Sequence, residues 1–268
     1  MAKALSKLFF RLSQSFDLTL ELPVGRRSVR MRCTNARELR RAYTLFTKEP
    51  MTVSLLSDEV HEGDVVWDIG ANVGLYTLVA ARAVGSNGKV VAFEPMAANF
   101  SRLLDNVALN RFNERVSLIS TPLSNVTGVT RLYYDDPTAG ATGAQINAPI
   151  GVSDTAFVPS LVEIKSTLTA DELLQGDFIP RPHVVKLDVD GHEPAILKGM
   201  ADTLCHPEFR PRIVIVEVNP GDGEEISAVM RSYGYQLDRR EPTGPSKKRL
   251  NQGTDYNQLT YNAAFRPI

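Results

Sequence analysis

Apolar and amphipathic stretches alternate through the middle of the chain. Runs such as VVWDI and RIVIVEV are mostly apolar, whereas the stretches between them place apolar residues three or four positions apart. The first pattern indicates strands buried on both faces, and the second indicates helices with one buried face. The elements predicted in this way are strands at 65–69, 89–93, 116–120, 184–189 and 212–218 and helices at 74–84, 96–110, 193–203 and 223–233. Because strands and helices alternate, we expect an α/β protein with a doubly wound, mostly parallel sheet.

Three stretches depart from this alternation. Residues 16–34 alternate apolar and polar around Pro23-Val24-Gly25, which predicts a β-hairpin, and two helical patterns follow it. Residues 121–183 are rich in turn residues and are interpreted as a β-rich insertion with a short helix. Residues 241–258 are polar and irregular, and LTYNAAF after them resembles a last strand.

The length of 268 residues suits one α/β domain with additions. We therefore expect residues 1–62 to form a hairpin and helices that pack on a core domain of residues 63–268, with the insertion at about 121–183. Residues 1–15 interleave leucine and phenylalanine with lysine and arginine. A helix packed on the body of the protein or on a second subunit is favoured there over a membrane-surface helix. A homodimer through this extension is one arrangement that the sequence allows, and the oligomeric state stays open.

The charge balance limits the partners. Lys and Arg number 30, Asp and Glu number 31, and no long basic run occurs, so nucleic acid is not expected as a partner. No apolar run reaches the roughly 18 residues of a transmembrane segment. Cys33 and Cys205 lie far apart without metal-binding spacing, which favours a reduced, cytoplasmic protein.

A glycine turn follows the first predicted strand of the sheet. It reads Asp68-Ile-Gly70-Ala-Asn72-Val-Gly74, with Asn72 where a dinucleotide-binding turn has its second glycine. A diphosphate needs that glycine for close approach of the backbone, so a cofactor without phosphates fits better. S-adenosylmethionine is such a cofactor, because its amino-acid end suits the open amides of a helix N-terminus and a strand-end carboxylate.

Glu94 supports the same cofactor. It ends the next predicted strand in VVAFEP, 26 residues after Asp68, where a carboxylate can accept hydrogen bonds from both ribose hydroxyls. Pro95 prevents the strand from continuing, and Asn99 falls in the first turn of the following helix. The turn and Glu94 together, at the spacing of one βαβ unit, predict an S-adenosylmethionine site.

The candidate chemistry lies in VVKLDVDGHEP, at the end of the fourth predicted strand. Strand alternation predicts that Asp188 and Asp190 lie on one side, with His192 close by. Methyl transfer to a hydroxyl needs an acceptor aligned with the methyl group and a general base. Asp188 could orient the cofactor or acceptor, Asp190 and His192 are the candidate bases, and His192 is narrowly preferred because its ordinary pKa is closest to neutral.

A divalent metal is a less favoured alternative. Asp188, Asp190, His192 and Glu217 are suitable ligand types, and a metal would acidify an acceptor hydroxyl. The spacing is not a ligand signature by itself, so we predict no metal.

Four separated blocks, WDIGANVGLYT, VVAFEP, STLTADELL and VVKLDVDGHEPAILKGM, resemble FkbM-family methyltransferases over roughly residues 48–220. The resemblance implies a class I Rossmann-like fold with a seven-stranded sheet whose last strand is antiparallel. It also implies S-adenosylmethionine-dependent O-methylation of a sugar, glycan or other natural product. The residues predicted to bind the cofactor are Asp68, Gly70, Ala71, Asn72, Gly74, Tyr76, Thr77, Glu94, Pro95, Asn99 and Asp188.

The acceptor is not identified by the sequence. Relatives commonly have Glu and a small residue where this chain has Asp190 and His192, which leaves the catalytic assignment open. N-methyl transfer, a non-catalytic cofactor-binding or scaffold protein, and a nicotinamide oxidoreductase are the alternatives. We expect acceptor specificity to reside in residues 1–62, 121–183 and 239–258, with tyrosines as candidate contacts. These tyrosines are Tyr133, Tyr134 and Tyr256.

Overall fold

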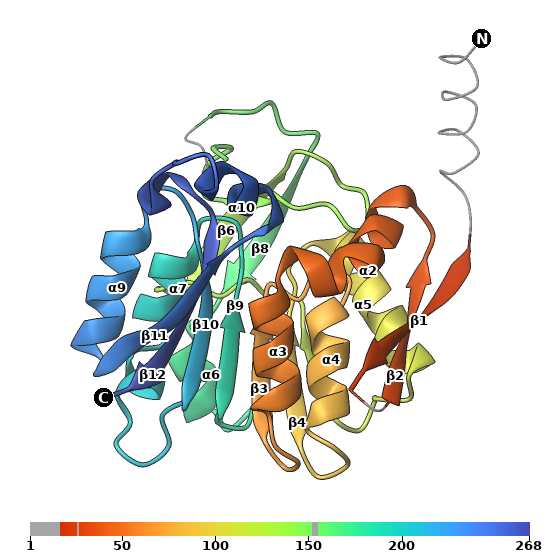
Figure 1. Ribbon diagram of the computed structural model, residues 1–268, viewed down its shortest axis with the longest axis horizontal. Coiled ribbons are helices and arrows are strands. Elements are labelled where there is room, and N and C mark those ends of the chain that lie inside the picture. Colours follow the sequence, from red (N-terminus) through yellow and green to blue (C-terminus); the bar gives the residue numbers. More distant parts are fainter. Residues whose placement is uncertain (1–16, 26, 152–154) are drawn as a thin grey trace.

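A computed structural model describes residues 17–25, 27–151 and 155–268 (Figure 1). The predictions for residues 1–15, including the docking helix and its role in a homodimer, lie outside these ranges. Within them, no helix combines the length and apolar character that crossing a bilayer requires. Cys33 is buried, Cys205 is exposed, and both are free thiols.

A seven-stranded sheet forms the centre of the molecule. The strand order is β5-β4-β3-β9-β10-β12-β11, and β12 alone runs antiparallel to its neighbours. This order confirms the predicted Rossmann-like fold with an antiparallel last strand. The strands are β3 (Val65–Ile69), β4 (Lys89–Phe93), β5 (Val116–Ile119), β9 (Val184–Leu187), β10 (Ile213–Val218), β11 (Tyr235–Pro242) and β12 (Tyr261–Pro267).

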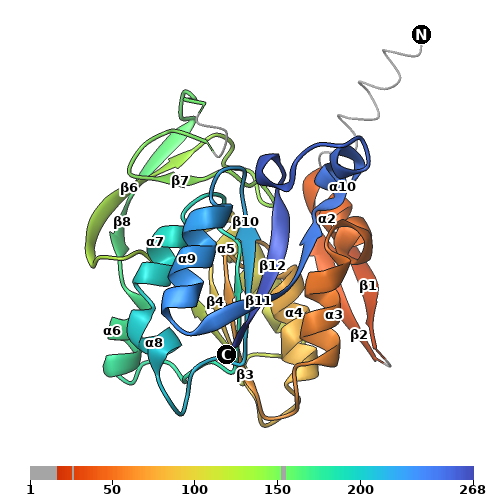
Figure 2. The ribbon, with the colours of Figure 1, turned by 60° about the vertical axis from the view of Figure 1, so that its left-hand side comes forward.

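Helices cover both faces of this sheet (Figures 1 and 2). Adjacent residues of one strand point to opposite faces, so Val66 joins one apolar cluster and Trp67 joins the other. The first cluster receives α2 (Ala36–Lys48), α3 (Pro50–Asp58), α4 (Leu75–Ala83) and α5 (Ala97–Leu109). The second receives α6 (Ala170–Gln175), α7 (Glu193–Lys198), α8 (Ala201–Cys205) and α9 (Gly223–Ser232). Burial on both faces explains why the central strands are apolar throughout.

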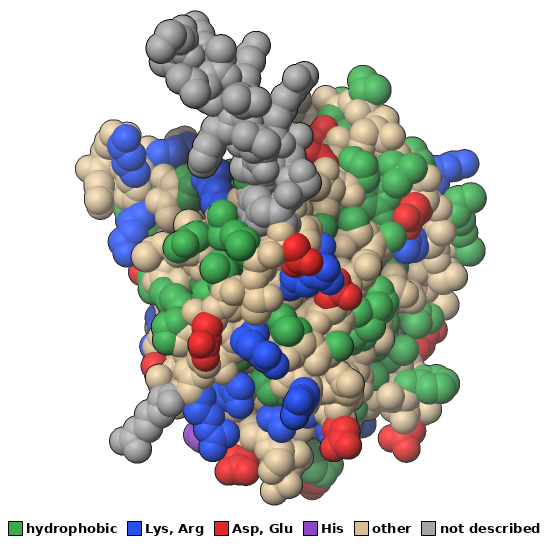
Figure 3. Space-filling model, turned by 90° about the vertical axis from the view of Figure 1, so that its right-hand side faces the viewer, with side chains coloured by type: hydrophobic (Ala, Val, Ile, Leu, Met, Phe, Trp, Pro, Cys, Tyr) green, Lys and Arg blue, Asp and Glu red, His purple; other side chains and the backbone are tan. Residues whose placement is uncertain are grey.

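The N-terminal hairpin consists of β1 (Leu18–Val24) and β2 (Arg27–Cys33), as predicted. Side chains of α5 attach it to the core, because Asn106 accepts from the Arg32 backbone N–H at 2.8 Å. The Asn35 side chain then caps α2. The face that carries the hairpin shows basic and acidic side chains interspersed among hydrophobic ones (Figure 3). The described residues of this region, 17–25 and 27–62, thus pack on the core, while the domain boundary at residue 62 stays a prediction.

The insertion forms a small antiparallel sheet beside the core. Its strands are β6 (Gly128–Tyr134), β7 (Gln145–Ile146) and β8 (Leu161–Thr167), in the order β7-β6-β8. The short helix α6 follows, and Thr169 and Glu172 form a reciprocal capping box at its start. The predicted β-rich insertion with a short helix is therefore confirmed.

Three predicted elements differ from the structure. The helix expected at 193–203 is interrupted at Gly199 and Met200, where the chain passes the backbone of Ser124 so closely that a Cβ on Gly199 would lie 2.1 Å from the Ser124 carbonyl oxygen. The strand expected at 184–189 ends at Leu187. The stretch expected to be irregular at 241–258 contains α10 (Gly244–Leu250) and a short 3-10 turn (Tyr256–Gln258). A proline in the first turn favours α10, since its missing N–H is not needed there.

Candidate active site

The glycine turn after β3 lies against the end of β9. Gly70 has φ of 82°, and a Cβ at this position would lie 1.8 Å from the Asp188 carbonyl oxygen. Only glycine fits both the left-handed conformation and this approach. The sequence therefore brings the cofactor turn into direct contact with the acidic block that follows β9.

Glu94 is buried at the end of β4 and holds the neighbouring turns. Its carboxylate accepts the backbone N–H of Asn72 at 2.7 Å and that of Met96 at 2.8 Å. Burial raises the pKa of Glu94 to about 7, although both hydrogen bonds oppose this rise. Each carboxylate oxygen can accept more than one hydrogen bond, so the group retains acceptor capacity toward a ligand.

A cavity of about 80 Å³ separates the glycine turn from the segment 140–144 of the insertion. Six of the predicted cofactor residues line it, together with Arg41, Met96, Val189, Asp190 and residues 141–144. The six are Gly70, Asn72, Glu94, Pro95, Asn99 and Asp188. The structure thus brings these residues to one cavity, and their role in cofactor binding stays a prediction.

The other predicted cofactor residues lie behind this cavity and do not line it. Asp68 accepts from the Thr77 hydroxyl at 2.6 Å and pairs with the Lys186 ammonium at 3.2 Å. Tyr76 donates its hydroxyl to Glu49 at 2.8 Å. Ala71 and Gly74 shape the turn through their backbones, where the Gly74 N–H donates to the Ala71 carbonyl. These residues make contacts within the protein, and their role in cofactor binding also stays a prediction.

A larger cavity, of about 710 Å³, adjoins the first. Asp188, Asp190 and Glu217 at the carboxyl ends of β9 and β10 form what we call its floor. The remaining lining residues form what we call its roof and come from α2, the insertion and the start of α10. The roof residues are Arg37, Arg40, Arg41, Thr44, Thr47, Lys48, Gly140, Ala141, Thr142, Gly244 and Pro245. Each segment in which we expected acceptor specificity therefore contributes to the roof.

The two cavities share five lining residues, which mark the place where they meet. These are Arg41, Ala141, Thr142, Asp188 and Asp190. A ligand in the smaller cavity and a ligand in the larger one would therefore face each other beside the two aspartates. This arrangement suits the transfer of a group from one ligand to the other.

The turn that carries Asp188 and Asp190 is held by hydrogen bonds to Glu193. We predicted that Asp190 belongs to the strand and lies on the same side as Asp188 by strand alternation. Because β9 ends at Leu187, Asp190 lies instead in the turn after the strand, with φ of 59°. The buried Glu193 carboxylate accepts the backbone N–H groups of Val189 and Gly191, each at 2.9 Å. Burial raises the pKa of Glu193 to about 8. Non-glycine residues in the left-handed region are strained and cluster at functional sites.

The surroundings of Asp188 and Asp190 shift the pKa values of these two carboxyl groups in opposite directions. Burial opposes ionisation of Asp188, but the Lys186 ammonium at 3.3 Å and the Lys48 cation outweigh it, so the pKa of Asp188 lies below its usual value. Burial and the charge of Asp188 raise the pKa of Asp190, against a hydrogen bond from the Gly143 N–H at 2.8 Å. The ionised form of Asp188 is therefore favoured, and Asp190 is the stronger base of the two.

His192 lies apart from both cavities. Its Nε2 is 3.1 Å from the Ser124 hydroxyl, and burial lowers the pKa of its imidazole. The residue occupies the position before the first turn of α7 and lines neither cavity. Our preference for His192 as the base thus gains no geometric support.

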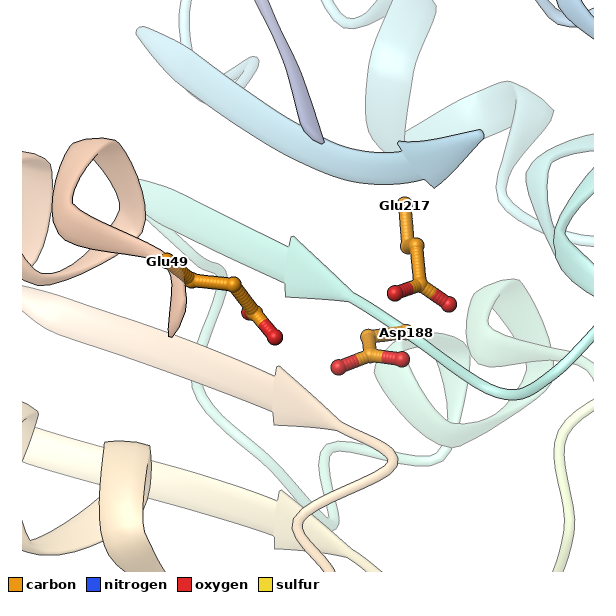
Figure 4. Close-up of side chains that lie close together, drawn as sticks. All are labelled: Glu49, Asp188 and Glu217. Atoms are coloured by element: carbon orange, nitrogen blue, oxygen red, sulfur yellow. The ribbon is translucent and has the colours of Figure 1, made fainter. Parts of the chain in front are cut away.

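Glu49, at the junction of α2 and α3, joins Asp188 and Glu217 in a group of carboxylates within 4.8 Å of one another (Figure 4). Asp190 and His192, from the set that we considered as metal ligands, are not in this group. Lys48 pairs with Glu49 at 2.6 Å, and burial with the charge of Asp188 raises the pKa of Glu217 well above its usual value. The Lys48 and Lys186 cations offset part of the negative charge of this group, and the absence of a metal stays a prediction.

Sequence reasoning missed Glu49 and the arginines of α2. Pro50 after Glu49 signals a helix start, but no local pattern shows that this carboxylate faces the end of β9. The tyrosines proposed as acceptor contacts line neither cavity. Tyr134 is buried beside Met96, and Tyr256 packs edge-on against Tyr261.

The strand order, the glycine turn and the acidic edge define the class of Rossmann-like methyltransferases. The model of the methyltransferase FkbM domain matches residues 68–237, and the chain belongs to this family of S-adenosylmethionine-dependent enzymes. The family assignment confirms the resemblance noted in the sequence and argues against a nicotinamide oxidoreductase.

Several relatives are similar to this chain. The hexuronic acid methyltransferase AglP of Haloferax volcanii is 31% identical over 183 residues, covering 68% of this chain and 67% of AglP. The 31-O-demethyl-FK506 methyltransferase FkbM of Streptomyces tacrolimicus is 27% identical over 201 residues, covering 67% of this chain and 75% of that protein. The crystal structure of methyltransferase FkbM from Methylobacillus flagellatus aligns with a TM-score of 0.49 at 15% identity, covering 76% of this chain and 43% of that one.

Proposed function

We propose that the protein transfers the methyl group of S-adenosylmethionine to a hydroxyl group of a sugar, glycan or other natural product. One observation carries the proposal: the cavity beside the glycine turn and Glu94 meets the larger cavity at Asp188 and Asp190. The similarity to a hexuronic acid methyltransferase and to a 31-O-demethyl-FK506 methyltransferase supports a hydroxylated acceptor.

The residues of the smaller cavity fit the cofactor in charge. When bound, S-adenosylmethionine supplies an electrophilic methyl group on a sulfonium. Glu94 offers acceptors for hydroxyl groups, and Asp188 offers a fixed negative charge for a cationic ligand. Asn72 stands where a diphosphate would need glycine, which favours a cofactor of this type over a dinucleotide.

The cavity is too small for an adenosyl group as it stands, since sites for such ligands hold roughly 300 Å³ or more. Segment 140–144 closes it: the Ala141 carbonyl accepts from the Asn72 and Asn99 side-chain amides at 2.8 and 3.2 Å, and the Gly140 N–H donates to Asn99 at 2.7 Å. Cofactor binding therefore includes displacement of this segment.

Asp190 is the residue that we assign as general base. It lies where the two cavities meet, and burial raises its pKa, which makes this carboxylate a stronger base than an ordinary aspartate. In our scheme Asp190 accepts the hydroxyl proton as the acceptor oxygen forms its bond to the methyl carbon. Asp188 stays ionised and orients the reacting groups. A hydroxyl needs such a base more than an amine does, which favours O-methyl over N-methyl transfer.

Calorimetry with S-adenosylmethionine tests the first half of the proposal, which is that the protein binds this cofactor. Failure of the folded protein to bind S-adenosylmethionine would contradict it. Radiolabelled methyl transfer to a panel of hydroxylated sugars then tests the second half. We expect Asp190→Asn to lower kcat about 10²–10⁴-fold because the amide cannot accept the proton, with little change in cofactor affinity.

His192→Gln is the matched comparison, because it removes the other candidate base, which lies two positions after Asp190 in the sequence. We expect a change of less than about threefold in kcat, because the imidazole lines neither cavity. A larger loss in His192→Gln than in Asp190→Asn would return the base to the histidine.

A further inference from the structure

One face of α2 is strongly basic and lines the roof of the larger cavity. Arg37, Arg40, Arg41, Thr44, Thr47 and Lys48 recur three or four positions apart, so they lie on the same side of the helix. We call this set the α2 basic stripe. The opposite side of the helix carries the buried residues Glu38, Ala42 and Leu45. The helix therefore packs with one face and presents its cationic face to the cavity.

The cavity is unusually polar for a small-molecule site. Ala141 and Pro245 are the apolar side chains among the described residues that line it, whereas ligand pockets are usually lined mostly by hydrophobic groups. A large apolar acceptor would remove water from the arginines without replacing their hydrogen bonds, which is costly. The cavity thus selects for a polar ligand.

The cations of the stripe are incompletely neutralised. Arg37 pairs with Asp136 at 2.7 Å, and Lys48 pairs with Glu49 at 2.6 Å. Arg41 donates its Nε to the Gly140 carbonyl at 2.7 Å. In the part of the chain that the structure describes, Arg40 makes no ion pair, and the terminal nitrogens of Arg41 have no hydrogen-bond acceptor. Two guanidinium groups are therefore available to an anion that enters the cavity.

The floor and the stripe divide the cavity into two poles. Asp188, Asp190 and Glu217 form the acidic pole, and the acceptor hydroxyl must lie there to reach the methyl group and the base. The rest of the acceptor then extends toward the basic pole. Guanidinium groups bind carboxylates and phosphates through paired hydrogen bonds, which neutral hydroxyl groups do not match in strength.

We propose that the α2 basic stripe binds an oxyanion of the methyl acceptor, so that the substrate is an acidic, hydroxylated molecule, held through Arg40 and Arg41. This proposal rests on the proposed function, since it takes the larger cavity as the acceptor site. The oxyanion is a carboxylate, as in a uronic acid, or a phosphate ester, as in a sugar phosphate, because both present the same paired oxygens.

Calorimetry on the full-length protein saturated with S-adenosylhomocysteine tests the proposal. The ligands are glucuronic acid, glucose 1-phosphate and glucose, which share one ring and differ in the anion. We expect at least one anionic ligand to bind about tenfold or more tightly than glucose, and the tighter of the two identifies the source of the oxyanion. Equal affinity for glucose and both anions would overturn the proposal.

The double variant Arg40→Gln, Arg41→Gln should lose this preference by about tenfold or more, whereas Arg231→Gln, an exposed arginine of α9 outside the cavity, should keep it. Arg40→Lys with Arg41→Lys should restore part of the affinity, because the charge returns without the planar fork. Unchanged anion binding in the glutamine variant would contradict the proposal.

The affinity for S-adenosylhomocysteine separates this proposal from the proposed function. We expect Arg40→Gln alone, at a residue that lines the larger cavity and not the smaller one, to bind it as the unaltered protein does. A parallel loss would show that the stripe holds the cofactor, and would overturn the assignment to the acceptor. Failure of the unaltered protein to bind S-adenosylhomocysteine, seen before any anion is added, would contradict the proposed function instead.

Discussion

The floor and the roof of the larger cavity are built in different ways. The floor lies at the carboxyl ends of adjacent parallel strands, where Lys186 is 2% exposed and contacts Asp68, Asp188 and the Gly70 carbonyl. The roof comes from a helix before the first strand of the sheet, a loop of the insertion and the start of α10. Its cations are largely exposed; the Arg37 side chain, for example, retains 51% of its accessible surface.

This difference separates two tasks. A floor whose carboxylates are half-buried or buried, with the Lys186 ammonium beside Asp188 and the Gly143 N–H donating to Asp190, can hold a carboxylate in one position and shift its pKa, as we expect methyl transfer to require. An exposed roof on added segments can change from one protein to another without disturbing the sheet. Among relatives with this fold, we therefore expect the reaction to follow the floor and the acceptor to follow the roof.

Removing a cation from each region gives the largest expected contrast in stability. Lys186→Met leaves Asp68 and Asp188 buried without their cation, so the free energy of unfolding should fall by about 3–5 kcal/mol. Arg37→Met breaks the exposed pair with Asp136 and should cost less than about 1 kcal/mol. Urea unfolding followed by circular dichroism measures both, and equal losses would show that the roof is as tightly coupled to the core as the floor.

Adding a methyl group at a glycine beside each region gives a smaller contrast, since Gly70 contacts the floor residue Asp188 and Gly143 follows the roof residue Thr142. Gly70→Ala would place its Cβ against the Asp188 carbonyl as well as in an unfavourable left-handed conformation, at a cost of about 2–4 kcal/mol. Gly143→Ala meets no atom within 4 Å and should cost only the conformational part, about 1 kcal/mol. Thermal unfolding of the two variants checks the order, which reverses if segment 140–144 is the more constrained of the two.

The pH dependence of cofactor affinity is the smallest expected effect, and it tests the floor's neighbour Glu94. With a pKa of about 7, this carboxyl group is mostly protonated at pH 6 and mostly ionised at pH 8. If the ionised form accepts the ligand's hydroxyl groups, the affinity for S-adenosylhomocysteine should increase about tenfold from pH 6 to pH 8. Calorimetry at several pH values measures it. Glu94→Gln should lack this increase, and an identical profile in the variant would assign the titration to another group.

Local patterns in the sequence determined the central fold. Buried strands must be apolar on both faces, so Val65–Ile69 and Lys89–Phe93 were located to the residue, and the glycine turn and Glu94 followed from their positions at the ends of those strands. The insertion was recognised because its turn residues interrupt the alternation. The prediction failed for two elements. The predicted helix is interrupted after Lys198, where Gly199 lies against the Ser124 backbone, and the predicted strand ends at Leu187, before Asp188.

The composition of the site was decided by the tertiary structure. Arg41 and Asp188 are separated by 147 positions, from 41 to 188, and no local pattern relates them to each other or to Glu49. In the structure Arg41 and Asp188 line one cavity, and Glu49 lies beside Asp188. The positions of Asp190 and His192 were also decided by the tertiary structure, because Asp190 lines the cavity, whereas His192 lies beside Ser124. Periodicity reports which face of an element is buried; it carries no information about which distant segment will cover the other face.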